Sequence, residues 1–313
     1  MLAAPLLALA LSASAAQITP QKVTIGAYLN DIQHLELKSH SYAVDVYLWF
    51  RWKDPELDPA TAVEFMNPNE LWGHARTQAF PKPVKLPNGE LYQVLRVQGR
   101  FSRKLPLNDY PFDRQALTVD IEDSSAGVDK LRYESGGLAV SPELSIPGFK
   151  IGDSTLTVSP FRYNTDFGDL RHKGETAYSR VRLSVPLSRP ALTYSVKLLL
   201  PILSVIFCAS LMFLFHPKHV DARVGIGITA LLTIVALQIT LNDDLPEVDY
   251  LVLMDKVYLG AYLFVIAGLA AVVKTTGIPD KESRRAILTE RWILAALLGG
   301  YLASMAFLIL PKL

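Results

Sequence analysis

Residues 221–243, DARVGIGITALLTIVALQITLND, decide the fold, because this segment is long enough to cross a bilayer and is charged only near its ends. From Val224 to Asn242 there is no ionisable side chain. At roughly 1.5 Å rise per residue, these 19 or so residues cover most of a hydrocarbon core. The segment therefore predicts a membrane-spanning helix.

One face of this predicted helix differs from the others. At about 100° per residue, a stripe of residues lies within roughly 80° of arc and runs acidic, small, polar, apolar and acidic. The other faces are apolar and suit lipid or neighbouring helices. A helix that lines a pore needs this asymmetry, although small and polar residues that let helices approach closely are an alternative explanation. The stripe consists of Asp221, Gly225, Thr229, Leu232, Ala236, Ile239 and Asp243.

Three further charge-free runs, residues 198–215, 257–273 and 292–311, are each about as long as a bilayer requires. Residues 191–313 therefore form the predicted transmembrane pore domain, an all-α bundle of four helices. The expected spans lie at about residues 193–215, 221–242, 250–273 and 290–311.

Loop charges orient these spans. The loop at residues 242–249 carries only acidic charges, whereas the loops before the second span and after the third carry lysine and arginine. The positive-inside rule then places the basic loops in the cytoplasm and both termini outside. We expect a multi-pass protein of the cell (inner) membrane, with its N-terminal domain and C-terminus outside or periplasmic.

The N-terminus fits export. Residues 1–16 combine a short apolar run with small residues, which predicts a signal peptide cleaved at Ala15 or Ala16. Because no basic residue precedes the apolar run, a disordered N-terminus is the alternative. The single cysteine of the chain, Cys208, excludes an intrachain disulfide, so the external domain depends on packing.

Residues 17–190 form the predicted extracellular or periplasmic ligand-binding domain. The chain there consists of short alternating segments broken by Pro, Gly, Asn and Asp, which is typical of an all-β, immunoglobulin-like sandwich. In the segment 41–52 the alternation puts Leu48, Phe50 and Trp52 on one face and an aromatic, basic set on the other. The predicted strands are residues 23–29, 41–52, 91–103, 115–122, 154–162 and 177–187.

Patterns of catalysis are missing from the sequence. The six histidines are scattered without zinc spacing, and neither a Gly-x-Ser-x-Gly elbow nor a phosphate-binding glycine loop occurs. We therefore expect no catalytic residue, no metal, no cofactor and no nucleic-acid partner. An exported, membrane-bound enzyme is the weaker hypothesis.

Residues 107–115, LNDYPFDRQ, resemble the Phe/Tyr-Pro-Phe-Asp-x-Gln core of the signature loop of pentameric ligand-gated ion channels, the Cys-loop receptor superfamily. The two loop cysteines of animal receptors fall here at Arg103 and Leu117, as in prokaryotic members. The loop after the third span is short, again as in bacterial relatives. Further matches in the same order are Trp52-Lys53-Asp54, Arg189, Pro201 and Leu245-Pro246.

The resemblance implies a homopentamer in membrane lipid, with the second span of each copy lining a pore. Asp221 would form a cytoplasmic ring of carboxylates that selects monovalent cations, unless it pairs with Arg223 or Lys218 instead. Gly225 and Thr229 would line the narrow inner part. The apolar constriction would be formed by Leu232, Ala236 and Ile239, and Asp243 would place charge in the outer vestibule.

The resemblance also implies a charged junction that couples the sandwich to the pore. It predicts Arg189 held between the carboxylates of Glu36 and Asp113, with ordinary structural pairing as the alternative. The moving target would be the loop after the second span, stiffened by Pro246. The signature-loop residues assigned to this junction are Tyr110, Pro111, Phe112 and Asp113.

In this family agonists bind between neighbouring external domains, behind a hairpin that corresponds here to residues 168–176. Each candidate aromatic could equally pack between subunits, and the agonist could be an amine, a carboxylate or a proton. One side of the candidate site has Phe167, Tyr178, Asp123 and Ser124, and the other has Tyr47, Trp49, Arg51, Tyr92 and Arg96.

The sequence thus favours a ligand-gated or proton-gated cation channel. A membrane-anchored ligand-binding receptor that does not conduct is the alternative. The short cytoplasmic loops weigh against that alternative, because they leave little surface for a signalling partner.

Overall fold

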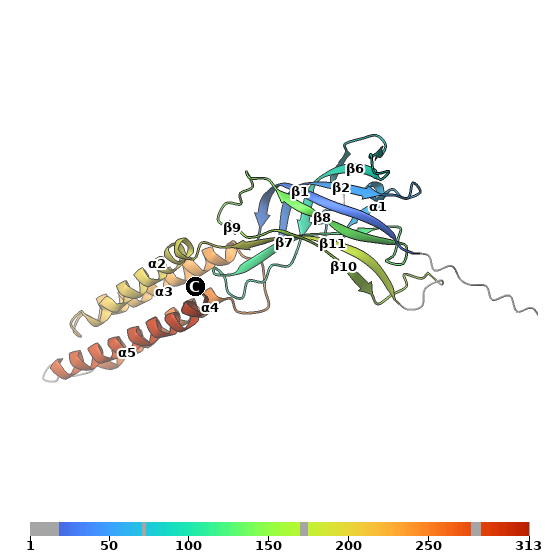
Figure 1. The fold of residues 1–313 in the computed structure, drawn as a ribbon. Helices are drawn as coiled ribbons and strands as arrows, with labels where there is room; N and C mark the ends of the chain where they lie inside the picture. Colours follow the sequence, from blue (N-terminus) through green and yellow to red (C-terminus); the bar gives the residue numbers. More distant parts are fainter. Residues whose placement is uncertain (1–18, 71–72, 170–174, 277–282, 313) are drawn as a thin grey trace, which may run out of the picture.

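The computed structural model describes residues 19–70, 73–169, 175–276 and 283–312, so the predicted signal peptide lies outside the described residues. The described chain forms a β-sandwich followed by a bundle of four long helices, arranged end to end (Figure 1). This is the predicted fold class, and it is consistent with the architecture of Cys-loop receptors.

Two sheets make the sandwich, with the orders β4-β6-β2-β1-β8 and β10-β11-β7-β3. Strand β5 adds to β6, and β9 adds to β11. The pair β1 and β8 is parallel, and the other recorded pairs are antiparallel. The first sheet has β1 (Gln21–Glu36), β2 (Ser41–Trp52), β4 (Ala75–Gln78), β5 (Val84–Lys85), β6 (Leu91–Ser102) and β8 (Leu131–Val140). The second has β3 (Val63–Phe65), β7 (Arg114–Asp123), β9 (Lys150–Ile151), β10 (Thr155–Tyr163) and β11 (Thr176–Ser188), and a short helix α1 (Pro59–Ala62) precedes β3.

Strand β2 shows why these residues form a sandwich. Its side chains alternate strictly, so that Leu48, Phe50 and Trp52 are buried between the sheets while Tyr47 and Trp49 are only half-buried on the outer face. Burying each large apolar side chain contributes roughly 1.5–3 kcal/mol. The alternation predicted from the sequence is therefore the one that fills the core.

A tyrosine joins the two sheets inside this core. The Tyr42 hydroxyl on β2 donates a hydrogen bond to the Thr118 carbonyl of β7 at 2.7 Å and accepts one from the Thr118 N–H at 3.0 Å. Tyr42 is fully buried. Because buried polar groups need partners, this side chain fixes one sheet against the other as well as filling space.

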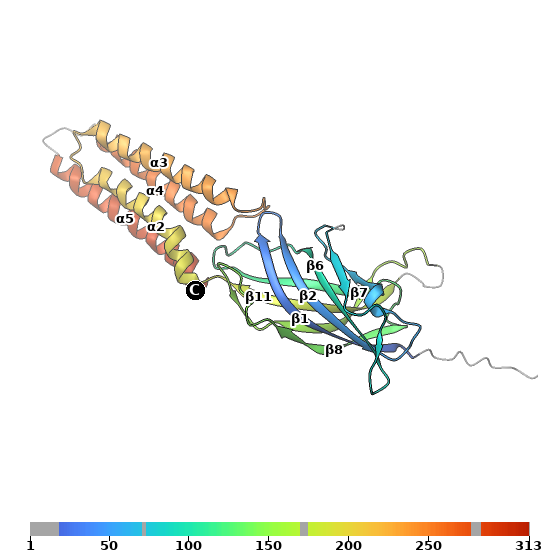
Figure 2. The same ribbon diagram turned by 90° about the horizontal axis from the view of Figure 1, so that it is seen from above.

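Four helices form the second part: α2 (Ala191–Ser210), α3 (Val220–Asp243), α4 (Leu253–Thr276) and α5 (Ser283–Ile309). Short 3-10 turns, η1 (Leu211–Phe213) and η3 (Leu310–Lys312), follow α2 and α5. In the described part of the chain, these four helices are long and apolar enough to cross a membrane. The chain runs away from the sandwich and back to it twice, so that α3 and α5 both end near the sandwich (Figures 1 and 2).

Several helix boundaries differ from the expected spans: α2 ends at Ser210 rather than 215, and α4 ends at Thr276 rather than 273. Helix α4 begins at Leu253 rather than 250, and the Asp255 carboxylate in its first turn accepts the Val252 N–H at 3.0 Å. Helix α5 begins at Ser283 rather than 290. For α5, hydropathy marks where the helix is apolar, whereas the helix itself begins in the charged residues before the apolar run.

We predict that Tyr42→Phe lowers the free energy of unfolding by about 1–3 kcal/mol, because the buried Thr118 N–H loses its partner. Thermal unfolding of the purified protein measures the effect. The control is Tyr28→Phe, which removes a hydroxyl from a side chain that is 36% exposed on the same sheet. Equal midpoints for the two variants would contradict the assigned role of Tyr42.

Candidate functional site

The stripe on α3 is exposed in the single chain, and its residues Gly225 and Thr229 line a groove beside α2. The seven residues of the stripe are all exposed, with Leu232 at 64% and Ile239 at 58%. The buried residues of α3 occupy the other side and include Arg223, Gly227 and Ala230. A large apolar side chain exposed on a membrane helix meets lipid, another copy or a pore, so the fold leaves this face for a partner outside the chain.

The glycines of α3 test the alternative explanation of the stripe, in which its small residues let helices approach closely. At Gly227 an added Cβ would lie 2.4 Å from the Leu269 side chain of α4, so this glycine permits a close approach within the bundle. An added Cβ at Gly225, which belongs to the stripe, would meet nothing within 4 Å. Within one chain, helix packing therefore explains Gly227 and not the stripe.

Asp221 is exposed and makes no ion pair with Lys218 or Arg223, all three being described residues. The Arg223 side chain is buried and pairs with Glu290 of α5 instead. The alternative in which Arg223 neutralises Asp221 thus does not hold within the chain.

A buried ion pair lies where the sandwich meets the bundle. Arg189, just before α2, contacts Asp113 of the loop before β7, with Nε to Oδ1 at 3.0 Å. The second Asp113 oxygen accepts a hydrogen bond from Gln115 Nε2 at 2.5 Å. Both charged side chains are about 4% exposed or less. Burial in low dielectric makes each charge dependent on the other.

Aromatic rings enclose the Arg189 guanidinium. Its Cζ lies 5.0 Å from the Tyr110 ring centroid, 4.4 Å from that of Phe149 and 5.0 Å from that of Tyr194. A planar guanidinium stacks on such rings in a way that lysine does not. Burial raises the pKa of Tyr110, so the ring presents a neutral phenol to the cation. Arg189 is therefore held from several sides.

Glu36 lies elsewhere than expected. Because β1 extends to this residue, its carboxylate reaches Arg100 of β6, with Nη2 to Oε1 at 3.1 Å, and accepts a hydrogen bond from Ser39. These partners, Ser39 first and then Arg100, lower the Glu36 pKa. Among the described residues, Arg189 pairs with Asp113 and not with Glu36, so the expected arrangement of one arginine between two carboxylates is wrong.

The signature loop enters the helical core. Leu107 and Tyr110 are buried among the residues of the bundle, and Phe112 packs against them. The Tyr110–Pro111 peptide is cis. The sandwich and the bundle therefore share side chains in addition to the covalent link between β11 and α2.

Sequence reasoning missed two backbone contacts at this junction. Leu107 N–H donates to the Tyr250 hydroxyl at 3.0 Å, and Leu253 N–H donates to the Asn108 carbonyl at 2.9 Å. A third contact, from Lys38 Nζ to the Asp243 carbonyl, is 3.5 Å and exposed. The signal for Tyr250 was an aromatic residue placed just before an apolar span, where tyrosine commonly marks the membrane boundary.

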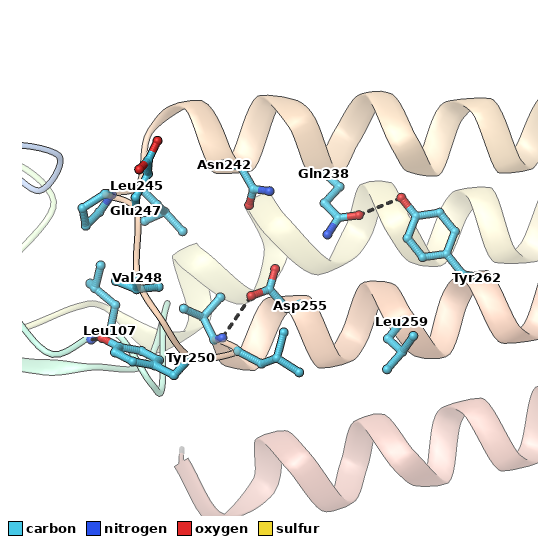
Figure 3. A pocket seen from close by; sticks show the side chains of 13 residues that line it. Leu107, Gln238, Asn242, Leu245, Glu247, Val248, Tyr250, Asp255, Leu259 and Tyr262 are labelled. Carbon is cyan, nitrogen blue, oxygen red and sulfur yellow. Dashed lines mark hydrogen bonds between the residues drawn. The ribbon is translucent and has the colours of Figure 1, made fainter.

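The connection between α3 and α4 lines a cavity of about 470 Å³ (Figure 3). Leu107 and Tyr250 stand at its sandwich end, and the Tyr262 hydroxyl donates to Gln238 of α3 at 2.7 Å further along the bundle. Pro246 is buried and lies in the same wall. The predicted coupling residue Pro246 is thus beside the contacts that join the two parts.

The outer face of the first sheet holds five of the candidate ligand residues. Trp49 lies flat over β1 and β8, where an added Cβ at Gly26 or Gly136 would come within 2.2 Å of its ring. Arg51 stacks on Trp49 at 5.3 Å and has Glu90 at 4.0 Å. The cross-strand partners of this set are Tyr47 with Arg96 and Arg51 with Tyr92.

Arg96 is also engaged. Its guanidinium lies 5.1 Å from the Tyr47 ring centroid and forms an ion pair with Asp45 at 2.6 Å. The hydrogen bond from Arg96 lowers the pKa of Asp45. Arg96 is therefore paired, whereas the Arg51 Nε is buried without a hydrogen-bond partner among the described residues.

On the second sheet, the candidate aromatics belong to a larger cluster. Phe167 and Tyr178 pack edge-on against Tyr163, with centroids 5.4 Å and 5.8 Å apart. Phe167 is 63% exposed, so much of its ring is open to a partner. The hairpin assigned to this site, residues 168–176, lies partly outside the described residues.

Sequence analysis did not identify the polar centre of this cluster. Arg180 pairs with Glu122 at 2.7 Å and lies 3.4 Å from the Phe161 ring centroid. The Tyr163 hydroxyl donates to Glu122 at 3.0 Å, and burial together with this bond raises the Tyr163 pKa. Alternation along β7 and β11 was the available signal, but it does not say which strands pair.

The Asp123 side chain stabilises its own loop and is not open to a ligand. The side chain is buried, and Oδ1 accepts hydrogen bonds from the Ser125 N–H, the Ser125 hydroxyl and the Ala126 N–H. These bonds close the loop after β7. Ser124, next to it, is exposed. Of the two predicted contacts on this loop, only Ser124 is open to a ligand.

A pocket of about 380 Å³ adjoins the cluster. Phe167 and Tyr178 form its aromatic wall. Among the described residues, its charged lining residues are Asp129, Lys130, Asp166, Asp169 and Glu175, of which Glu175 pairs with Arg162 at 3.7 Å. Such a lining favours a positively charged guest.

No protein-family model matches this chain. Among curated proteins, the chain is similar to glycine receptor subunit beta of Rattus norvegicus, Mus musculus and Homo sapiens. Each is 22% identical over 275 residues, which cover 80% of this chain and 54% of the relative. The chain thus spans about half the length of the curated relatives it matches. With the four long apolar helices, this weak similarity supports a multi-pass membrane protein akin to receptor subunits and not to an enzyme.

We predict that Arg189→Gln lowers the thermal midpoint by an amount equivalent to about 3–5 kcal/mol, because Asp113 is left as a buried, unpaired charge. The double variant Asp113→Asn/Arg189→Gln should regain much of the loss. Arg182→Gln is the matched control, since its pair with Asp120 is more exposed. If Arg189→Gln costs no more than Arg182→Gln, the junction pair is not a structural centre.

Proposed function

We propose that this chain is a subunit of a homopentameric ligand-gated ion channel of Cys-loop receptor type, selective for monovalent cations. The observation that carries the proposal is the polar stripe on α3, exposed over its whole length and left unexplained by packing within the chain. One helix cannot enclose a channel, so copies must close into a ring. The similarity to a receptor subunit and the Tyr-Pro-Phe-Asp loop support five copies.

Each part of the stripe has a physical role in this proposal. Asp221 forms a ring of carboxylates at the cytoplasmic mouth, where a narrow aperture concentrates cations and repels anions. Leu232, Ala236 and Ile239 form an apolar belt that closes by dewetting. Gly225 and Thr229 line the inner narrow part, and Asp243 adds charge to the outer vestibule.

The proposed placement in the cell follows from the loop charges and from the predicted signal peptide. Residues 17–190 form the external ligand-binding domain and residues 191–313 the pore domain, with a signal peptide at residues 1–16. The basic loops face the cytoplasm of a prokaryotic cell, and the chain sits in its inner membrane. The missing loop cysteines at Arg103 and Leu117 support a prokaryotic source.

The junction transmits movement in this proposal. Arg189 and Asp113 tie the signature loop to the start of α2, and Leu107 and Asn108 hold the connection that follows α3. A displacement of the sandwich therefore reaches the outer end of the pore helix through the buried Arg189–Asp113 pair and the hydrogen bonds of Leu107 and Asn108. Pro246 limits how much of that displacement the connection can absorb.

We assign an organic amine as the class of agonist. Among its described residues, the pocket beside Phe167 and Tyr178 has more acidic than basic side chains and an aromatic wall, which suits an ammonium group. Two of the arginines that would bind a carboxylate are already engaged, Arg96 with Asp45 and Arg180 with Glu122. The pKa values of Glu36 and Asp45 are lowered, away from neutral pH, which argues against protons acting through them.

Channel function is tested with Asp221→Asn. Purified protein in lipid should conduct, and the variant should lose cation preference by several-fold in reversal-potential measurements under a salt gradient. The control, Asp249→Asn, removes an exposed carboxylate outside the stripe and should change little. Persistent silence of intact pentamers would favour the non-conducting receptor, and an unchanged preference in Asp221→Asn would remove Asp221 from the selectivity ring.

Agonist class is tested by recording responses to amines, to carboxylates of similar size and to pH steps between about 8 and 5. Amines should open the channel, and Phe167→Ala should raise the half-maximal amine concentration by roughly 5- to 30-fold, as expected for a lost cation–π contact. Val140→Ala, an exposed apolar residue on β8, is the control. Opening by carboxylates or by acid alone would refute the amine assignment.

A further inference from the structure

A second buried ion pair lies inside the helical bundle, at the end away from the sandwich. Arg223 of α3 and Glu290 of α5 are both 0% exposed, with Arg223 Nη2 2.6 Å from Glu290 Oε1. Arg223 Nε donates to the Met212 carbonyl of η1 at 2.7 Å. Thr275 of α4 donates its hydroxyl to the same Glu290 oxygen. The pair therefore ties α3 to η1, α4 and α5.

Packing alone does not account for this pair. Charges are costly to remove from water, and apolar residues of similar volume often serve as well or better for stability. Ionisable residues within membrane helices usually face the bundle interior, pair with one another and mark function. The stripe on α3 does not include either residue, so the proposed function does not yet explain why they are charged.

The position of Arg223 relative to Asp221 supplies an explanation. Two residues along a helix are about 200° apart around the axis and about 3 Å apart along it. Asp221 is exposed and Arg223 is fully buried. A positive charge thus lies within one turn of the proposed cytoplasmic mouth, but it points into the bundle and faces a carboxylate.

We propose that Glu290 is a specificity-determining residue: it holds the Arg223 guanidinium inside the bundle and cancels its charge, so that Asp221 alone sets the charge at the cytoplasmic mouth. This inference rests on the proposed function. Without the carboxylate, each copy carries an uncompensated guanidinium beside Asp221. Whether that guanidinium stays buried or turns toward the water-filled mouth, it weakens the negative potential that attracts cations.

The test compares Glu290→Gln, Arg223→Gln and the double variant in purified protein reconstituted in lipid. Reversal potentials under a salt gradient give cation-over-anion permeability. Glu290→Gln should lose this preference by several-fold, and the double variant should regain the wild-type value because no unpaired positive charge remains. Arg291→Gln is the matched control, since it removes an exposed charge next to Glu290 and should leave the preference unchanged.

A purely structural role would give a different pattern. Thermal unfolding midpoints would then fall in both single variants and recover in the double variant, while the reversal potential stayed at its wild-type value; that result overturns the inference. If Glu290→Gln does not assemble, Arg223→Gln decides. It leaves an uncompensated carboxylate and should keep or strengthen cation preference, and a weaker preference overturns the inference.

Different results would overturn the proposed channel function and the inference about Glu290. A wild-type protein that assembles and stays silent with every agonist class overturns the channel, and the inference with it. A wild-type channel that prefers cations, combined with an unchanged Glu290→Gln, overturns the inference alone.

Discussion

The buried pair of Arg189 and Asp113 is the contact on which the arrangement of the molecule depends. The sandwich and the bundle have separate apolar cores, and the signature loop is the element that contributes side chains to the second of them. Asp113 sits in that loop and Arg189 at the start of α2, so the pair fixes the loop at the point where the chain passes from one part to the other. The aromatic rings around the guanidinium remove water and make the pairing costly to break.

The bilayer supplies the second constraint. Polar groups within a hydrocarbon core must be satisfied by protein or by enclosed water. Inside the bundle Arg223 and Glu290 form an ion pair, with Met212 and Thr275 as their hydrogen-bond partners, whereas the exposed hydroxyls of Thr233 and Thr240 bond back to α3 itself. The carboxylates at either end of the stripe have no such arrangement. In the proposed channel, a ring of copies around water lets α3 keep its exposed face without placing charge against lipid.

Sequence patterns predicted the parts of this structure that depend on one element at a time. Apolar runs located the four helices, and strict alternation in β2 gave both its bounds and its buried face. These sequence patterns did not predict β8, because Gly136 and Gly137 interrupt its alternation. The segment is a strand because it pairs with β1. Periodicity indicates a face and leaves the partner open.

The same limit explains the errors at the candidate sites. Glu36 pairs with Arg100, and Asp123 accepts hydrogen bonds within its own loop. These partners are set by strand register and turn geometry, which involve more than one element. The centre formed by Glu122, Tyr163 and Arg180 brings together three strands. No spacing within any one strand marks it. Apolar runs and alternation along the chain were therefore enough to predict the fold. Contacts between distant segments were needed to identify the residues that surround the site.

The two ends of α3 are held differently, and this difference bears on how a pore of this kind would open. At its start, Arg223 is buried and anchored to η1 and α5. At its other end the helix meets the sandwich through an exposed 3.5 Å contact to Lys38 and through the connection carrying Tyr250. Contacts that are few and exposed yield first. In the proposed channel, the apolar belt near the outer end is therefore the part free to move, while the charged mouth beside Glu290 keeps its geometry.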